Sequence, residues 1–226
     1  MTGTLALVGG AEWTEGCSFD GGLLEASGGS VVTVLPTAAA YENPDRVMAN
    51  AAGWFARLGA TTEALAVTAR SHASDPDLVQ GAAAARFLYV ASGSPMHLRS
   101  VLIGTPLLDA MVSAWRSGAV LAMAAESATV FCTHMVDSRG GAFTGGLGLL
   151  DALTVLPRAD TWSEDKWHRT VRLAAPDLAV VGIDERTALI SGPQGWRAEG
   201  AGAVTVWRGG HRIEVTDLAP LSLGAT

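Results

Sequence analysis

The sequence predicts an α/β protein, a three-layer αβα sandwich with a mainly parallel central sheet. Short apolar runs alternate along the chain with longer segments of helical periodicity, a pattern typical of βαβ units with right-handed crossovers. The apolar runs are continuous rather than alternating, which indicates a sheet covered on both faces. No linker, internal repeat or low-complexity tract interrupts residues 1–226, so we expect a single domain.

The strands are predicted from short runs rich in β-branched and other apolar residues. The run from Val31 to Leu35 is the clearest, because three valines and a threonine precede Leu35 and Pro36 ends the run. Apolar and polar residues alternate near the C-terminus, as far as Leu218, and turn residues separate them. This pattern predicts antiparallel strands at the edge of the sheet. The predicted strands cover residues 5–8, 31–35, 64–67, 87–90, 119–124, 178–181 and 187–190.

The helices are predicted from helical spacing and from residues suited to helix starts. Asn43 suits an N-cap and Pro44 a first turn. Ser163 is expected to cap a later helix, with Glu164 and Asp165 in its first turn. The glycine-rich segment 140–148 is expected to be a loop. The predicted helices cover residues 19–26, 44–58, 76–85, 163–174, and 96–115 as one or two helices broken near 104–106.

Composition excludes several classes of function. The formal charge is −7 and Lys166 is the only lysine, so we expect neither nucleic-acid nor membrane-surface binding. No apolar run approaches the roughly 20 residues of a membrane span, and the first residues lack the basic start of a signal peptide. Cys17 and Cys132 lie far apart and show no metal-binding spacing. We expect a cytoplasmic protein without a metal or other cofactor.

The stretch from Ser117 to Val130 draws attention as a possible site. It reads as a buried strand, a tight corner of small residues and the start of a helix. In three-layer α/β proteins, this kind of corner at the carboxyl end of a central strand often holds a catalytic nucleophile.

Five segments in the right order resemble a known family. They resemble the dipeptidase E and cyanophycinase family of serine peptidases, over about residues 5 to 210. The resemblance implies the fold of class I glutamine amidotransferases. The segments are Gly9-Gly10, Pro36-Thr37-Ala38, Gly104-Thr105-Pro106-Leu107, Gly146-Leu147-Gly148-Leu149-Leu150 and, most specifically, Gly182-Ile183-Asp184-Glu185-x-Thr187-Ala188-Leu189.

The sequence departs from the family pattern where the chemistry would be. The family's nucleophilic serine falls on Ala125, and its general-base histidine falls on Arg158. Arginine stays protonated and cannot accept a proton from a hydroxyl. Of the family's catalytic groups, only the acid is matched, by Glu185 or its neighbour Asp184.

The resemblance also places a degenerate substrate loop on Ser92-Gly93-Ser94-Pro95, in place of Gly-Gly-Asp-Gln. Gly93 could still offer a backbone N–H of the kind that stabilises an oxyanion. Gly93, Ser94 and His97 are therefore the candidate ligand-binding residues, for a small peptide or an amino-acid-like ligand.

Three hypotheses follow. The first is a non-catalytic homologue that keeps the cleft for binding or assembly, since triad members act as a unit and several are replaced together. The second is an active serine hydrolase of small Asp-containing peptides with Ser127 as nucleophile, which requires the strand to run two residues further. The third is an amidotransferase-like enzyme using Cys132, expected within the helix after the corner. Family resemblance and base rates also suggest a C2 homodimer.

Overall fold

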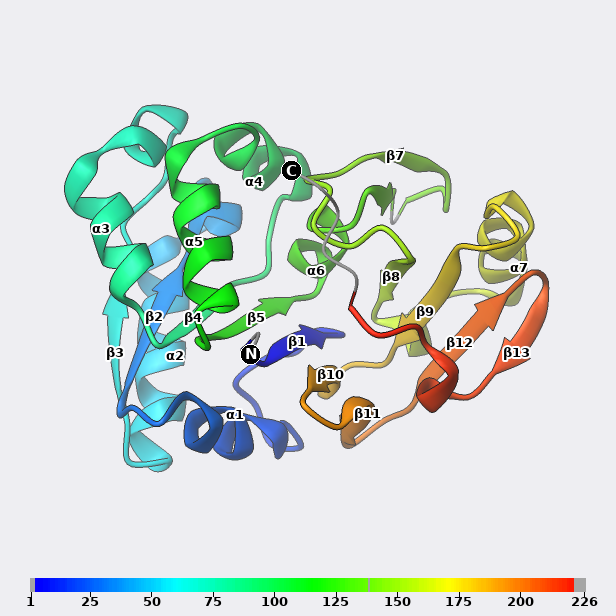
Figure 1. The fold of residues 1–226 in the computed structure, drawn as a ribbon, viewed down its shortest axis with the longest axis horizontal. Coiled ribbons are helices and arrows are strands. Elements are labelled where there is room, and N and C mark those ends of the chain that lie inside the picture. The colour runs from blue at the N-terminus through cyan, green and yellow to red at the C-terminus, as the bar shows by residue number, and fades with distance from the viewer. Residues whose placement is uncertain (1–2, 138, 222–226) are drawn as a thin grey trace.

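A seven-stranded sheet forms the centre of the computed structural model, which describes residues 3–137 and 139–221. Five of its strands are parallel and two antiparallel strands complete one edge (Figure 1). Register places Leu7 beside Met123 and Leu88 beside Leu121. In spatial order the strands are β11 (Gly195–Gly200), β10 (Thr187–Gly192), β1 (Leu5–Val8), β5 (Val120–Ala124), β4 (Phe87–Val90), β2 (Val31–Leu35) and β3 (Thr61–Ala64).

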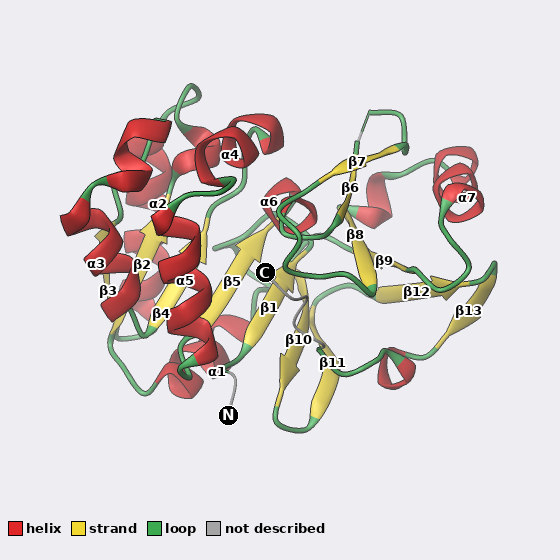
Figure 2. Cartoon of the chain, turned by 45° about the horizontal axis from the view of Figure 1, so that its top comes forward, coloured by secondary structure: helices red, strands yellow, loops and turns green. Residues whose placement is uncertain are grey.

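Helices cover both faces of this sheet (Figure 2). A hydrophobic cluster lies on each face. On one face, Ala6 and Val34 pack with residues of α1 (Phe19–Ser27) and α2 (Pro44–Arg57). On the other face, Leu5 and Leu35 pack with α3, α4 and α5. The predicted three-layer architecture with a mainly parallel sheet is confirmed. The remaining helices are α3 (Pro76–Ala84), α4 (Pro95–Leu102), α5 (Pro106–Arg116), α6 (Glu126–Val130) and α7 (Glu164–Leu173).

Helix starts follow local chemistry at several positions. Asn43 accepts a hydrogen bond from the Arg46 N–H at 3.0 Å, as its place before Pro44 predicts. Thr105 caps α5 in the same way, which explains the predicted break between α4 and α5. Ser163 precedes α7, but its side chain makes no capping hydrogen bond, so that part of the prediction is wrong.

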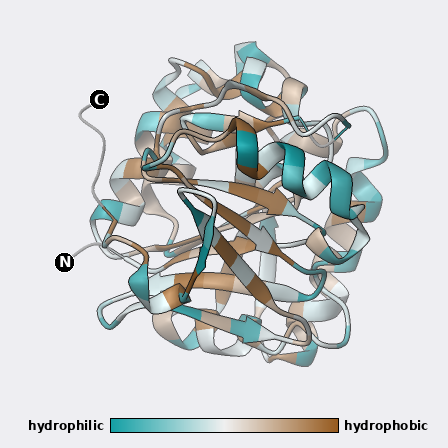
Figure 3. Ribbon diagram, turned by 90° about the vertical axis from the view of Figure 1, so that its right-hand side faces the viewer, coloured by the Kyte–Doolittle hydropathy of each residue, from teal (hydrophilic) through white to brown (hydrophobic). Residues whose placement is uncertain are grey.

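A second, four-stranded sheet packs beside the first. Its spatial order is β13 (His211–Ile213), β12 (Val204–Arg208), β9 (Ala179–Ile183) and β8 (Leu153–Pro157). Figure 3 shows the hydrophobic strands of the molecule in brown between more hydrophilic helix surfaces. One hydrophobic cluster contains Leu5 from the first sheet together with Val155 and Val181 from the second. A separate hairpin joins β6 (His134–Val136) to β7 (Phe143–Gly145).

Two sequence predictions are wrong, and one strand was missed. The third strand covers Thr61–Ala64 rather than 64–67, because an exposed edge strand need not be apolar. The strand predicted at 178–181 is confirmed as β9, which lies in the second sheet, but its parallel neighbour β8 was not predicted. The segment 140–148, expected to be a loop, contains β7. Short 3-10 helices lie at Thr37–Ala39, Arg70–Ser74, Ala159–Thr161 and Val215–Asp217.

The carboxyl ends of β1, β4, β5 and β8 converge on one region, and that convergence creates the candidate site. Within residues 3–137 and 139–221, no helix combines the length and apolar character needed to cross a membrane.

Candidate functional site

Ala125 forms the corner between β5 and α6, and its backbone is strained. Its φ of 47° and ψ of −124° lie outside the regions that residues with a Cβ ordinarily adopt. Its N–H donates to the Val8 carbonyl oxygen at 2.8 Å, which ties the corner to the end of β1. A sharp strand-to-helix turn with a strained residue at its tip is the geometry of a nucleophile elbow. Here the tip carries only a methyl group.

Arg158 lies beside this elbow, at the end of β8. Its backbone is in the left-handed region, with φ 51° and ψ 46°, and its N–H donates to the Gly9 carbonyl oxygen at 2.8 Å. A Cβ added to Gly10 would lie 2.9 Å from Arg158 Cγ and 3.5 Å from Ala125 Cβ. The Gly9-Gly10 pair therefore lets the ends of β1, β5 and β8 approach closely, because Gly10 has no side chain to fill the space.

The guanidinium of Arg158 forms an ion pair with Glu126, the first residue of α6. The Glu126 side chain is 9% exposed, whereas that of Arg158 is 44% exposed. A carboxylate at a helix N-terminus is also favoured by the helix dipole. The pair thus places one half-exposed cation and one buried anion immediately next to the elbow.

A cavity of about 330 Å³ opens over the elbow and is strongly charged. Its wall carries four carboxylates, from Glu12, Glu42, Glu126 and Glu185, and the one guanidinium of Arg158. Glu12 accepts a hydrogen bond from the Ser92 N–H at 3.0 Å, so it ties the loop after β1 to the loop after β4. The other lining residues are Ala11, Ser92, Gly93, Pro95 and Ala125.

Sequence reasoning gave no role to three of the four carboxylates, those of Glu12, Glu42 and Glu126. A signal existed for Glu12, because it lies two residues after the Gly9-Gly10 turn at the carboxyl end of a strand. No comparable signal marks Glu42, which reaches the cavity from the segment before α2.

Ser127 does not line this cavity. Its side chain is fully buried, and its hydroxyl donates a hydrogen bond to the Ala91 carbonyl oxygen at 2.6 Å. The strand ends at Ala124, so the two-residue extension that would bring Ser127 to the elbow is absent. In this arrangement the Ser127 hydroxyl faces the interior and cannot meet a ligand bound over Ala125.

Cys132 lies after the end of α6 rather than within it, which corrects the sequence prediction. It pairs with Leu150 in an isolated bridge and is fully buried. Burial raises the pKa of the Cys132 thiol to about 12. The thiolate that nucleophilic chemistry needs is therefore scarce at neutral pH.

The loop residues after β4 have different roles. Gly93 lines the elbow cavity, and its φ of 147° and close packing against the Ala38 carbonyl require glycine. Ser94 caps α4 by accepting a hydrogen bond from the His97 N–H at 3.4 Å. His97 lies outside the elbow cavity, with its Nε2 2.9 Å from the Thr68 carbonyl oxygen and its ring 4.7 Å from that of Tyr41.

Of the two candidate acids, only Glu185 lines the cavity. Its backbone N–H donates to Asp160 Oδ1 at 3.1 Å, which fixes the turn between β9 and β10. Asp184 instead accepts the Ala203 N–H at 2.9 Å and holds the start of β12. In the described part of the chain, no group of three His, Cys, Asp or Glu side chains is arranged to hold a metal ion.

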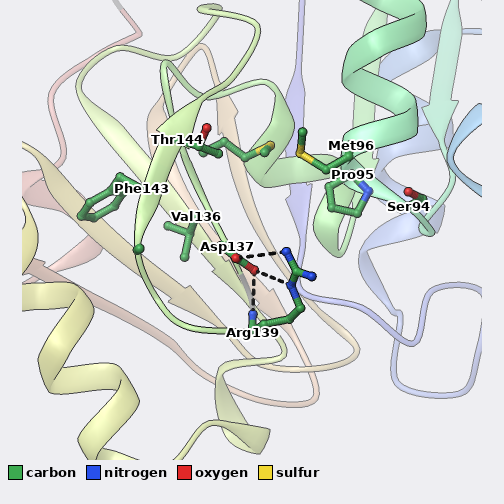
Figure 4. Close-up of a pocket in the computed structure, with 10 residues that line it drawn as sticks. Ser94, Pro95, Met96, Val136, Asp137, Arg139, Phe143 and Thr144 are labelled. Carbon is green, nitrogen blue, oxygen red and sulfur yellow. Dashed lines mark hydrogen bonds and ion pairs between the residues drawn. The ribbon is translucent and has the colours of Figure 1, made fainter.

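A second cavity of about 510 Å³ adjoins the first, and Pro95 lines both (Figure 4). Its walls come from the start of α4 and from the β6–β7 hairpin. The lining residues are Ser94, Pro95, Met96, Met135, Val136, Asp137, Arg139, Ala142, Phe143 and Thr144.

Comparison with protein families supports the resemblance seen in the sequence. The model of peptidase family S51 matches residues 6–195. The chain belongs to this family. The dipeptidase E and cyanophycinase resemblance predicted from the five sequence segments is thereby confirmed.

Solved structures support the fold of this S51 chain. A peptidase from an acI-B1 Actinobacterium is 29% identical, with a TM-score of 0.83, and the match covers 96% of this chain and 95% of that one. A putative peptidase E protein from Listeria monocytogenes EGD-e shares the fold at 16% identity, with a TM-score of 0.67, covering 89% of this chain and 100% of that one. A comparison with curated proteins found no match.

Proposed function

We propose that this S51 protein is non-catalytic and binds a small peptide or an amino-acid-like ligand in the elbow cavity. The observation that carries the proposal is the methyl side chain of Ala125 at the strained tip between β5 and α6. A nucleophile there needs a hydroxyl or thiol, and alanine offers no attacking atom.

The surroundings of the elbow support the same proposal. Arg158 lies where a proton acceptor is needed, and a guanidinium only donates. The Ser127 hydroxyl is fully buried and donates to the Ala91 carbonyl oxygen, so it is poorly placed to substitute for a missing nucleophile. The raised pKa of Cys132 argues against a thiol mechanism.

The charges of the cavity favour a zwitterionic ligand. Arg158 is half-exposed and has donors beyond the one it gives to Glu126, so it can bind a carboxylate. Glu12, Glu42 and Glu185 line the same cavity and can accept hydrogen bonds from an ammonium group. An amino acid or short peptide with free termini carries both charges.

A fluorophosphonate probe tests the absence of a serine nucleophile. We expect no covalent labelling of the wild-type protein, measured by intact-mass spectrometry. Labelling at Ser127 that the Ser127→Ala substitution abolishes would overturn the proposal in favour of a serine hydrolase.

Calorimetric titration with glycyl dipeptides tests the binding half of the proposal. We expect binding that Arg158→Gln weakens by about ten-fold or more, because a charge-assisted hydrogen bond contributes about 1.5–3 kcal/mol. Arg57→Gln is the matched control, since Arg57 pairs with Glu15 on the exposed surface outside the cavity. Equal binding by both variants, or no binding by the wild type, would contradict a ligand site at the elbow.

The C2 homodimer and the cytoplasmic location stay predictions of the sequence. Sedimentation equilibrium of the purified chain checks the first, and a twofold mass is the expected result.

A further inference from the structure

The cavity next to the elbow has a different chemical character from the elbow cavity. Six of its ten lining residues are apolar, namely Pro95, Met96, Met135, Val136, Ala142 and Phe143, and its volume is about 510 Å³. Pockets of this size with mainly apolar walls and a few polar groups are typical of small-molecule sites. The elbow cavity, in contrast, is lined by charged groups.

The charged side chains of the second cavity neutralise each other. Arg139 donates to both Asp137 carboxylate oxygens, at 3.1 and 3.3 Å, as the dashed lines in Figure 4 show. These hydrogen bonds hold the pKa of Asp137 below its usual range. The two charges are opposite and paired, so they add no net charge to the cavity wall, and the Arg139 side chain, which is 88% exposed, keeps its contact with water.

The two cavities adjoin at the start of α4. Pro95 lines both, Gly93 lines the first and Ser94 the second. Figure 4 shows Pro95 and Met96 on one side of the second cavity and Val136 on the other. Met96 is 55% exposed, and its flexible thioether side chain can adapt to an apolar group placed against it.

We propose that this second cavity is an apolar side-chain subsite for the ligand whose charged backbone occupies the elbow cavity. The inference rests on the function proposed above and narrows it to short peptides with a large apolar side chain next to the residue held at the elbow. Specificity follows from burial of the accessible apolar surface of Met96 and Phe143 rather than from charge.

Three dipeptides with the same termini test this proposal by calorimetric titration: Gly-Leu, Gly-Asn and Gly-Gly. We expect Gly-Leu to bind at least about ten-fold more tightly than Gly-Gly, as burial of a leucine side chain predicts. Gly-Asn, whose side chain has nearly the same size as leucine, should show little of this gain. Equal affinities for all three would overturn the subsite while leaving the proposed function intact. Binding of none would overturn both.

Substitution at Met96 ties the preference to this cavity. Met96→Asp should reduce the ratio of Gly-Leu to Gly-Gly affinity several-fold, because a carboxylate at the cavity wall disfavours an apolar neighbour. Because Gly-Leu and Gly-Gly carry the same charges, their affinity ratio cancels any general effect of the added charge on ligand binding. Leu173→Asp is the matched control, since Leu173 is also 55% exposed but lies on α7, outside both cavities. An unchanged ratio in Met96→Asp, or an equal fall in Leu173→Asp, would overturn the subsite.

Discussion

The Arg158 guanidinium pairs with Glu126, the residue directly after the strained Ala125. The pair joins the end of β8, a strand of the second sheet, to the start of α6, the helix that follows β5 of the first sheet. It therefore holds the two sides of the elbow together and fixes the only cation among the residues that line the cavity.

Arg158→Ala should destabilise the fold because it leaves the buried Glu126 carboxylate without a partner. We expect a loss of about 1–2 kcal/mol in the free energy of unfolding, below the value for a fully buried pair because Arg158 is half-exposed. Urea denaturation measures it. In a Glu126→Gln background the same substitution should have little effect, and an undiminished loss there would show that the pair is not responsible.

Ala125→Gly should stabilise the protein by about 1 kcal/mol. Relief of backbone strain contributes about 1–3 kcal/mol, and the greater flexibility of glycine in the unfolded chain opposes it by about 0.5–1 kcal/mol. For a chain of this length the melting temperature should rise by about 2–4 °C, measured by calorimetry. Ala128→Gly, within α6, is the control and should lower it. A fall in both variants would argue against strain at Ala125.

Ala125→Ser combined with Arg158→His should restore reactivity toward a fluorophosphonate. The first substitution supplies an attacking hydroxyl at the elbow tip, and the second supplies a neighbouring side chain that can accept its proton. We expect slow labelling of the introduced serine in the double variant and none with Ala125→Ser alone. If the double variant folds and stays unlabelled, the cavity lacks more than these two groups.

The stability of the protein should fall as pH rises through the range in which Asp20 titrates. Burial raises the pKa of Asp20 to about 7 from its usual 3.8, although Trp54 Nε1 donates to its carboxylate at 2.8 Å and opposes the shift. The nearby charge of Glu12 raises it further. The folded state therefore binds this proton more tightly than the unfolded state does. The stability that the protonated Asp20 contributes is complete below about pH 4 and is lost by about pH 7.

Asp20→Asn isolates this effect because it removes the titrating group and keeps an acceptor for Trp54. Relative to the wild type, the variant should gain about 2–4 kcal/mol of unfolding free energy between pH 4 and pH 8. Denaturation at a series of pH values measures the difference. The exposed Asp45→Asn is the control. A difference that does not change with pH would contradict the raised pKa.

The sequence determined most of the local structure. The valine-rich run at Val31–Leu35 was predicted with its observed bounds, because β-branched residues and a terminal proline act over a few neighbours. The small residues around Ala125 indicated a strand-to-helix corner, and the observed backbone turns at that residue.

Only the tertiary structure decided how the site is assembled. The direction of the Ser127 hydroxyl depends on where β5 ends, because each residue of a helix turns the side chain by about 100°. Glu12, Glu42 and Arg158 meet in one cavity although they lie in separate segments of the chain. Hydrophobic periodicity reports whether a segment is buried but not which segments face each other. The pairing of β8 with β9, which brings Arg158 to the elbow, therefore had to come from the fold.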